Sequence, residues 1–133
     1  MLEPTKYEKL FSTPVFRFRV PDHATFNAEL LAEGNRMRAE SAGASKSNRG
    51  GWHSEGNLFD QDAACVNTLR DLATEAIYVA NDKIGARAPR DSLDLKIFAW
   101  MNANPKGGFN APHTHPGAHW SGVYYLAQPE IET

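Results

Sequence analysis

The chain has 133 residues, of which 41% are hydrophobic and 23% are charged, a balance typical of one soluble globular domain. Its formal net charge is −2 and its 14 basic residues are scattered, so we expect no nucleic-acid-binding or membrane-binding surface. No segment approaches the ~18 apolar residues of a membrane helix, and the N-terminus lacks a secretory signal, so we expect a cytoplasmic protein. The single cysteine, Cys65, excludes an internal disulfide and is expected to be a small core residue.

The first forty residues predict a strand followed by a helix. Residues 14–20 alternate apolar and basic side chains, which indicates a half-buried strand. Asp22 comes after the proline that ends this strand, and it is expected to cap a helix that reaches about Glu40. Apolar residues recur in that stretch at helical spacing.

A polar segment covers residues 41–57 and is rich in serine, glycine and asparagine. It also places Trp52 beside His53, which is unusual in a flexible linker. Two interpretations therefore remain open: a mobile linker, or a loop ordered over a substrate or a metal site.

A second helix is predicted after this loop. Asp60 or Asp62 is expected to cap it, and Gly85 is expected to stop it just after Ile84. Its apolar stripe consists of Val66, Leu69, Ala73, Ala76, Ile77, Ala80 and Ile84.

The C-terminal part predicts a sheet. Residues 92–101 alternate apolar and polar side chains as a strand does, and residues 104–108 form a turn. Residues 109–115 and 120–128 are further strand candidates. Helices first and an antiparallel sheet last predict an α+β fold.

His113 and His115 are the candidate metal ligands. On a strand, residues i and i+2 project from one face with backbones roughly 7 Å apart, so two imidazoles can bind one ion. Imidazole suits iron, zinc, copper and nickel, and the pair alone does not name the metal. Two histidines beside a turn can also be merely solvated, so the spacing by itself is a weak signal.

Four ordered motifs carry a resemblance that goes beyond this spacing. They are Trp100-Met101-Asn102, Gly107-Gly108-Phe109-Asn110, His113-Thr114-His115-Pro116 and Ser121-Gly122-Val123-Tyr124-Tyr125-Leu126. In this order they resemble a family of iron(II)/2-oxoglutarate-dependent oxygenases, and residues 11–15 and 47–54 resemble its upstream segments. The resemblance implies one such domain over residues 1–133, with N-terminal helices packed on an antiparallel jelly-roll barrel, or double-stranded β-helix.

The resemblance also implies the chemistry of the site. Iron(II) and the cosubstrate 2-oxoglutarate would hydroxylate a small-molecule or peptide substrate. His113 would be the first iron ligand, and His115 would stand where relatives place a carboxylate. Asn102, and whichever of Tyr124 and Tyr125 faces the barrel interior, could hydrogen-bond the cosubstrate. Trp100 and Trp120 are expected to be packing residues.

The family pattern implies more strands, a distal histidine and a basic residue for the cosubstrate, and none of these occurs before Thr133. We therefore expect a truncated member of the family with an incomplete metal site, and we assign no catalytic residue. Glu130, His119 and His53 are the candidates for a third ligand, although no motif places any of them. The incomplete sheet would leave an open edge through which copies of the chain could form a homo-oligomer.

Two other functions remain open at this point. The first is a catalytically inactive cupin-like module that binds a metal or a partner. The second, a zinc hydrolase, is less favoured because no acid/base residue follows the histidines as a metalloprotease helix motif requires.

Overall fold

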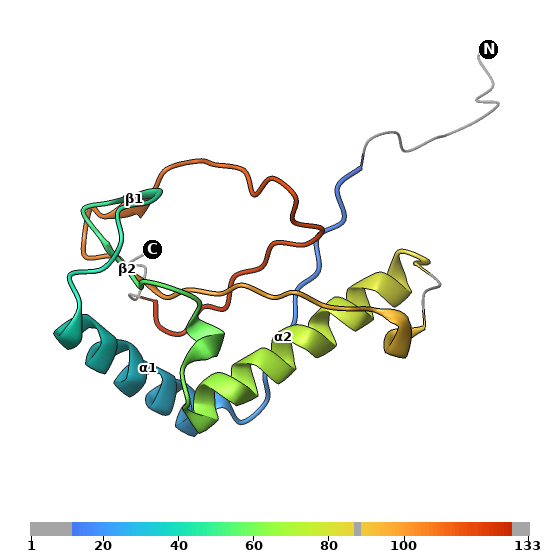
Figure 1. Cartoon of the computed structure of the whole chain (residues 1–133), viewed down its shortest axis with the longest axis horizontal. Helices are drawn as coiled ribbons and strands as arrows, with labels where there is room; N and C mark the ends of the chain where they lie inside the picture. The colour runs from blue at the N-terminus through green and yellow to red at the C-terminus, as the bar shows by residue number, and fades with distance from the viewer. Residues whose placement is uncertain (1–11, 87–88, 129–133) are drawn as a thin grey trace, which may run out of the picture.

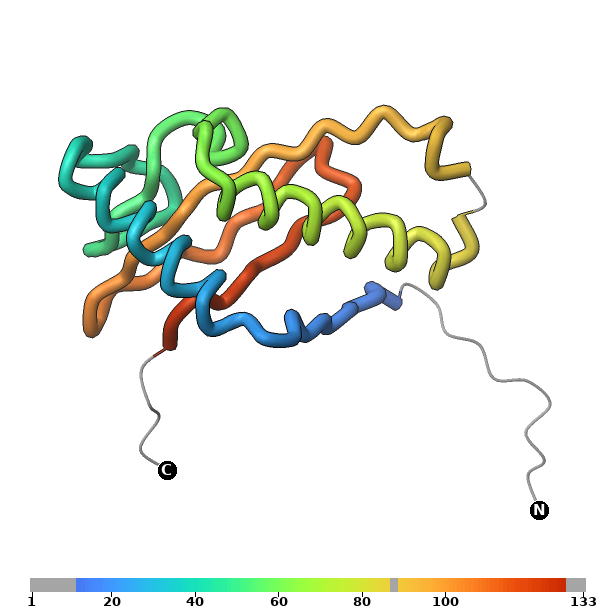
Figure 2. Tube along the Cα trace, turned by 90° about the horizontal axis from the view of Figure 1, so that it is seen from below, coloured from blue at the N-terminus to red at the C-terminus, as the bar shows by residue number. Residues whose placement is uncertain are grey.

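The structure is a computed structural model, which describes residues 12–86 and 89–128. Within these ranges it contains two α-helices and four two-residue strands, joined by long extended segments. Both helices lie on the same side of the extended segments (Figures 1 and 2). The predicted α+β class is confirmed, but two of the strands lie between the helices and not after them. No helix in the described ranges is both long and apolar enough to cross a membrane.

Helix α1 spans His23–Glu40, in agreement with the prediction. Leu30 and Met37, seven residues apart on one face, are its buried side chains. Asp22 does occupy the N-cap position, but its side chain makes no capping hydrogen bond. Its backbone is left-handed, with a φ of 47°, whereas a capping side chain normally starts from an extended backbone.

Ion pairs form along the surface of α1, but they do not hold the helix against the rest of the chain. Arg36 donates hydrogen bonds to Glu33 at 2.6 Å and to Glu40 at 2.5 Å, and it reaches Gln61 at 3.3 Å. The hydrogen bond from Arg36 holds the pKa of Glu33 below its usual value. Exposed pairs of this kind contribute at most about 1 kcal/mol each, so the apolar core must carry most of the stability.

Helix α2 spans Ala64–Lys83 and ends before Gly85, whose φ of 78° suits the predicted stop. The predicted caps are wrong. Leu58–Asp60 forms a separate 3-10 helix, η1, and the N-cap residue of α2 is Ala63, which offers no side-chain hydrogen bond. Asp62 lies one residue before that cap, so neither aspartate takes the role that the sequence pattern gave it.

A small apolar core lies where the two helices and the extended segments meet. Its buried members are Leu30, Met37, Leu58, Cys65 and Val66. Partly buried hydrophobic residues pack around them: Phe26, Trp52, Phe59, Ala63, Leu69, Ala99, Met101, Tyr124 and Leu126. Cys65 is 8% exposed, which confirms its predicted place in the core.

The strands pair in two small antiparallel sheets. Strand β1, Asn48–Arg49, pairs with β4, Phe109–Asn110. Strand β2, Trp52–His53, pairs with β3, Asn102–Ala103. Both pairings join the loop after α1 to the C-terminal part of the chain, so residues distant in sequence lie side by side (Figure 1).

The longer predicted strands are extended but lack ladders of backbone hydrogen bonds. This holds for residues 14–20 and 120–128, and for residues 93–101, which follow the 3-10 helix η2, Arg90–Ser92. The predicted alternation is present at residues 93–98, where residues 93, 95 and 97 are half-buried and residues 94, 96 and 98 are exposed. It is wrong for residues 14–20, where Val15 is 78% exposed and Phe18 is 54% exposed. The period-two pattern therefore indicates an extended backbone that packs one side on the core. The described residues do not close into a barrel, and so the predicted jelly roll is not seen in them.

The segment that contains Ala99 and Met101 is held by a loop and not by a long strand. Ser54 pairs with Met101 in both directions: its amide donates to the Met101 carbonyl at 2.9 Å, and its hydroxyl accepts from the Met101 amide at 3.0 Å. Asn57 Oδ1 accepts from the Ala99 amide at 2.9 Å, and the Leu58 amide donates to the Ala99 carbonyl at 2.8 Å. Backbone amides and polar side chains of this loop thus take the place of a neighbouring strand along this edge.

We expect Ser54→Ala to lower the free energy of unfolding by about 1–3 kcal/mol, because the Met101 amide would lose its acceptor in a partly buried place. Ser54 is 1% exposed, so water cannot easily replace the hydroxyl. Urea unfolding followed by far-UV circular dichroism measures the change. The exposed Ser45→Ala variant is the control, and a Ser54→Ala loss no larger than its loss would contradict this role.

Candidate metal centre

His113 and His115 lie in an extended segment between β4 and the turn at Gly117, and not in a strand as predicted. Pro112 and Pro116 flank the pair, and neither has an amide hydrogen for strand pairing. The two imidazoles nevertheless come together, with ring centroids 4.7 Å apart and planes at 77°. The predicted proximity of the two rings is therefore present, although a strand does not create it.

A backbone hydrogen bond orients the ring of His113. Its Nδ1 lies 2.7 Å from the carbonyl oxygen of Ala111, and because a carbonyl only accepts, Nδ1 carries the hydrogen. The Nε2 atom of the neutral ring then keeps its lone pair. This arrangement, one nitrogen bound to a carbonyl and the other available, is the usual one for metal-binding histidines. His113 is exposed and His115 is half-buried, so an ion can reach the pair from solvent.

Trp100 links this pair to a third histidine. The Trp100 ring stacks on His53, with centroids 5.5 Å apart and planes at 11°, and it lies 5.6 Å from the His115 ring. His53 is 8% exposed, and its Nδ1 lies 2.7 Å from the Ser54 carbonyl. Trp100 packs, as predicted, but its partners are two histidines, and this contact is the feature that the sequence did not indicate. The place of Trp100 in the Trp-Met-Asn motif was the available signal.

Trp120, in contrast, is a packing residue. Its ring meets Phe16 edge-on at 5.8 Å, and its indole nitrogen donates to Asn81 Oδ1 of α2 at 2.8 Å. This hydrogen bond joins the last extended segment to α2, which agrees with the predicted role.

The polar loop at residues 41–57 packs against this region in the structure, and the two interpretations of it, a mobile linker and a loop ordered over a site, stay predictions. Besides the β1–β4 pairing, the Ala111 amide donates to the Ser47 carbonyl at 2.8 Å, two residues before His113. Gly51 lies close to the β3 side of the chain, since a Cβ atom there would come within 1.9 Å of Asn104 Oδ1 and would have to displace that side chain.

The predicted cosubstrate-binding residues do not come together in the described structure. The Tyr124 hydroxyl donates to Asn27 Oδ1 on α1 at 2.6 Å, so this side chain faces the helices. Tyr125 projects to the opposite side and is 68% exposed. Asn102 is exposed in β3 opposite His53. Their role in binding 2-oxoglutarate stays a prediction.

In the described residues the two candidate metal ligands, His113 and His115, come together, and no third is grouped with them. No group of three or more histidine, cysteine, aspartate or glutamate side chains lies close enough to hold an ion in residues 12–86 and 89–128. His53 contacts Trp100, and His119 meets Trp120 edge-on at 5.9 Å, so neither is grouped with the pair. Glu130 lies outside the described residues. The site thus fits a metal ion as a two-imidazole partial site.

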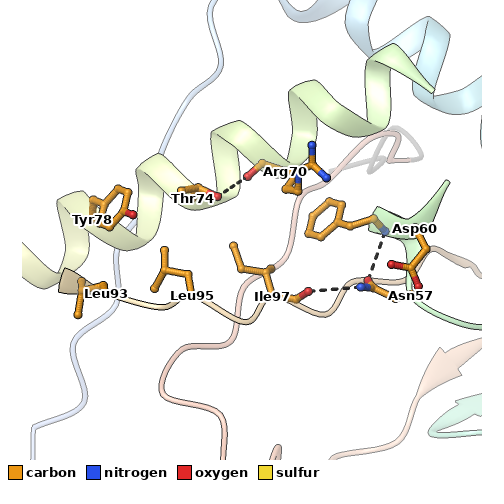
Figure 3. A pocket seen from close by; sticks show the side chains of 9 residues that line it. Asn57, Asp60, Arg70, Thr74, Tyr78, Leu93, Leu95 and Ile97 are labelled. Carbon is orange, nitrogen blue, oxygen red and sulfur yellow. Dashed lines mark hydrogen bonds between the residues drawn. The ribbon is translucent and has the colours of Figure 1, made fainter. Parts of the chain in front are cut away.

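A cavity of about 400 Å³ lies away from the histidines, between α2 and residues 93–97 (Figure 3). Leu93, Leu95 and Ile97 line one wall, and Thr74 and Tyr78 of α2 face them. It is an open groove beside the core, and none of the predicted site residues lines it.

Comparison with known proteins points to the same part of the chain. A sequence model of the family described as "Putative 2OG-Fe(II) oxygenase" matches residues 98–133, which include His113 and His115. No curated protein and no solved structure matches the chain. The likeness to this oxygenase family is therefore shown for the segment with the histidine pair, and the upstream resemblance at residues 47–54 stays a prediction.

Binding of a paramagnetic ion at the histidine pair should quench the fluorescence of Trp100, because the Trp100 ring lies 5.6 Å from His115. We expect saturable quenching by cobalt(II) that is lost in His113→Ala and in His115→Ala. The His23→Ala variant, changed at an exposed histidine at the start of α1, is the matched control and should quench as the parent does. Quenching that persists in Trp100→Phe would place the ion elsewhere.

Proposed function

We propose that this chain carries the metal-binding part of a non-haem iron(II)/2-oxoglutarate-dependent oxygenase, with His113 and His115 as iron ligands. One observation supports this most directly: two imidazoles lie 4.7 Å apart in the segment that matches the oxygenase family. The hydrogen bond from His113 to the Ala111 carbonyl supports it further, because it leaves Nε2 available to a metal.

The proposal extends to the fold. We propose that the extended segments at residues 93–103 and 120–128 belong to an antiparallel jelly-roll sheet, with α1 and α2 on its outer face. The alternation of half-buried and exposed side chains along these segments supports this, as does the position of both helices on one side (Figures 1 and 2). We propose that the metal site lies on the side of this sheet away from the core, because Trp100, which alternates with the core residues Ala99 and Met101, lies 5.6 Å from His115.

The residues of the chain have separate tasks in this proposal. His113 and His115 hold the ion, and the Ala111 carbonyl fixes the ring of the first. Trp100 forms an apolar wall beside His115. Tyr125 and Asn102 remain the candidates for contacts to the cosubstrate. Bound iron(II) with 2-oxoglutarate would supply the oxidising power for hydroxylation of a small molecule or peptide.

A second candidate function rests on the number of ligands. The described residues provide two, whereas a facial triad needs three to hold iron with positions open for the reactants. This observation favours a cupin-like module that binds a metal or a partner without catalysis. Both candidate functions use the same metal site, and they differ in whether the bound metal catalyses a reaction.

Anaerobic calorimetric titration with iron(II) tests the metal site. We expect saturable binding whose affinity falls at least tenfold in His113→Ala and in His115→Ala, because each variant removes one of two ligands. His23→Ala is the matched control, since His23 is an exposed histidine at the start of α1 and its loss is predicted to leave the affinity unchanged. If neither His113→Ala nor His115→Ala changed the affinity, both candidate functions would be rejected.

Aerobic incubation with iron(II) and 2-oxoglutarate separates the two candidates. Formation of succinate that is lost in His113→Ala would support the oxygenase. Metal binding without succinate would support the non-catalytic module, provided that the same preparation showed the calorimetric binding described above.

A further inference from the structure

The groove between α2 and residues 93–97 has an aliphatic wall and an aromatic wall (Figure 3). Leu93, Leu95 and Ile97 alternate along an extended segment, so their half-buried side chains lie on the side that faces α2. Tyr78 lines the groove from α2. The volume of about 400 Å³ falls in the range of small-molecule sites, which are concave as this groove is.

The aromatic wall is held in place by charged groups outside the groove. The Arg90 guanidinium lies 4.9 Å from the centre of the Tyr78 ring. Arg90 itself donates hydrogen bonds to Glu75 at 2.9 Å and to Asp82 at 3.5 Å. None of these three charged residues lines the groove. The Tyr78 ring is therefore fixed before a ligand arrives, which lowers the cost of binding one.

Two charged side chains do line the groove, Arg70 of α2 and Asp60 of η1. Asn57, the N-cap residue of η1, donates to the Ile97 carbonyl at 3.4 Å, which brings η1 to this end of the apolar wall. Within the described part of the chain, neither Arg70 nor Asp60 forms an ion pair with the other or with a third side chain. Their charged groups can thus pair with a ligand in the groove.

The charged and apolar linings lie toward opposite ends of the groove. Arg70 and Tyr78 both face it from α2 and are eight positions apart, or about 12 Å along the helix. Figure 3 shows Asp60 at the Arg70 end and Leu93 at the Tyr78 end. A matching ligand carries both a negative and a positive group at one end and an apolar group at the other.

We propose that this groove binds a free amino acid with a large apolar side chain. Arg70 pairs with the carboxylate of the ligand, and Asp60 accepts a hydrogen bond from its ammonium group. The apolar side chain of the ligand lies between Leu95 and Tyr78. None of the groove residues is a candidate metal ligand, so the inference goes beyond the proposed function and does not rest on it.

An amino acid matches this lining better than a simple carboxylate or a simple amine does. The Asp60 carboxylate repels a ligand that carries only negative charge, and the Arg70 guanidinium repels one that carries only positive charge. A ligand with both charges close together satisfies both side chains. Arg70 and Asp60 are exposed, so solvent weakens each pairing, and selectivity arises because the two act together.

Calorimetric titration of the full chain with L-phenylalanine tests the proposal, and we expect saturable binding at one site per chain. 3-Phenylpropionate lacks the ammonium group and phenethylamine lacks the carboxylate, so each should bind about threefold or more weakly. L-Alanine should bind at least about tenfold more weakly, because it lacks the large apolar side chain. Arg70→Gln and Asp60→Asn should each lower the affinity for L-phenylalanine about threefold or more.

Combining the variants with the ligands tests which side chain recognises which charge. Arg70→Gln should remove the preference for L-phenylalanine over phenethylamine, because the group that recognises the carboxylate is gone. Asp60→Asn should likewise remove the preference for L-phenylalanine over 3-phenylpropionate. The matched controls are Arg38→Gln on α1 and Asp71→Asn on α2, which do not line the groove and should bind L-phenylalanine as the parent does.

Three results would overturn the proposal. They are no saturable binding of L-phenylalanine, equal affinity for 3-phenylpropionate or phenethylamine, and unchanged affinity in either Arg70→Gln or Asp60→Asn. Circular dichroism shows that each variant keeps its fold, and the comparison of ligands on the parent chain needs no variant. Quenching of Trp100 by cobalt(II) reports the metal site separately, so failure here leaves the proposed function standing.

Discussion

The hydrogen bonds of Ser54 and Asn57 with the segment that contains Ala99 and Met101 are the constraint on which the rest of the site depends. That segment has a partly buried backbone but no long neighbouring strand, so its amides and carbonyls need other partners. With Ala99 and Met101 fixed on the side of the core, the alternation of an extended backbone turns Trp100 to the opposite side. There it stacks on His53 and lies against His115. A few polar groups in a loop thus determine which face of the chain can become a metal site.

The helices could be predicted because burial of an apolar stripe sets their period. Leu30 and Met37 in α1, and Val66 and Ala80 in α2, are buried at helical spacing. Their starts could not be predicted as well, since Asp22, Asp60 and Asp62 are plausible caps in sequence but none makes the capping hydrogen bond. Capping depends on the backbone angle of one residue, which the spacing of apolar residues does not report.

The candidate site likewise has a part that could be predicted from the sequence and a part that could not. The closeness of His113 and His115 followed from their spacing and their resemblance to the oxygenase family, and the structure places the rings 4.7 Å apart. The stacking of His53 on Trp100 could not be predicted, because it depends on the pairing of β2 with β3 across about fifty residues of sequence. Long-range register of this kind is set by tertiary packing and leaves little trace in local composition.

The hydrogen bond between Tyr124 and Asn27 has a consequence for how the chain is made. The two residues are 97 positions apart, so α1 is complete long before its partner exists. At a synthesis rate of about 5–20 residues per second, Asn27 would wait about 5–20 s for Tyr124 to be added. During that interval the inner side of α1, with Leu30, has no C-terminal segment to pack against. Until residues 120–128 leave the ribosome, this side of α1 stays open to misassociation and to chaperone binding.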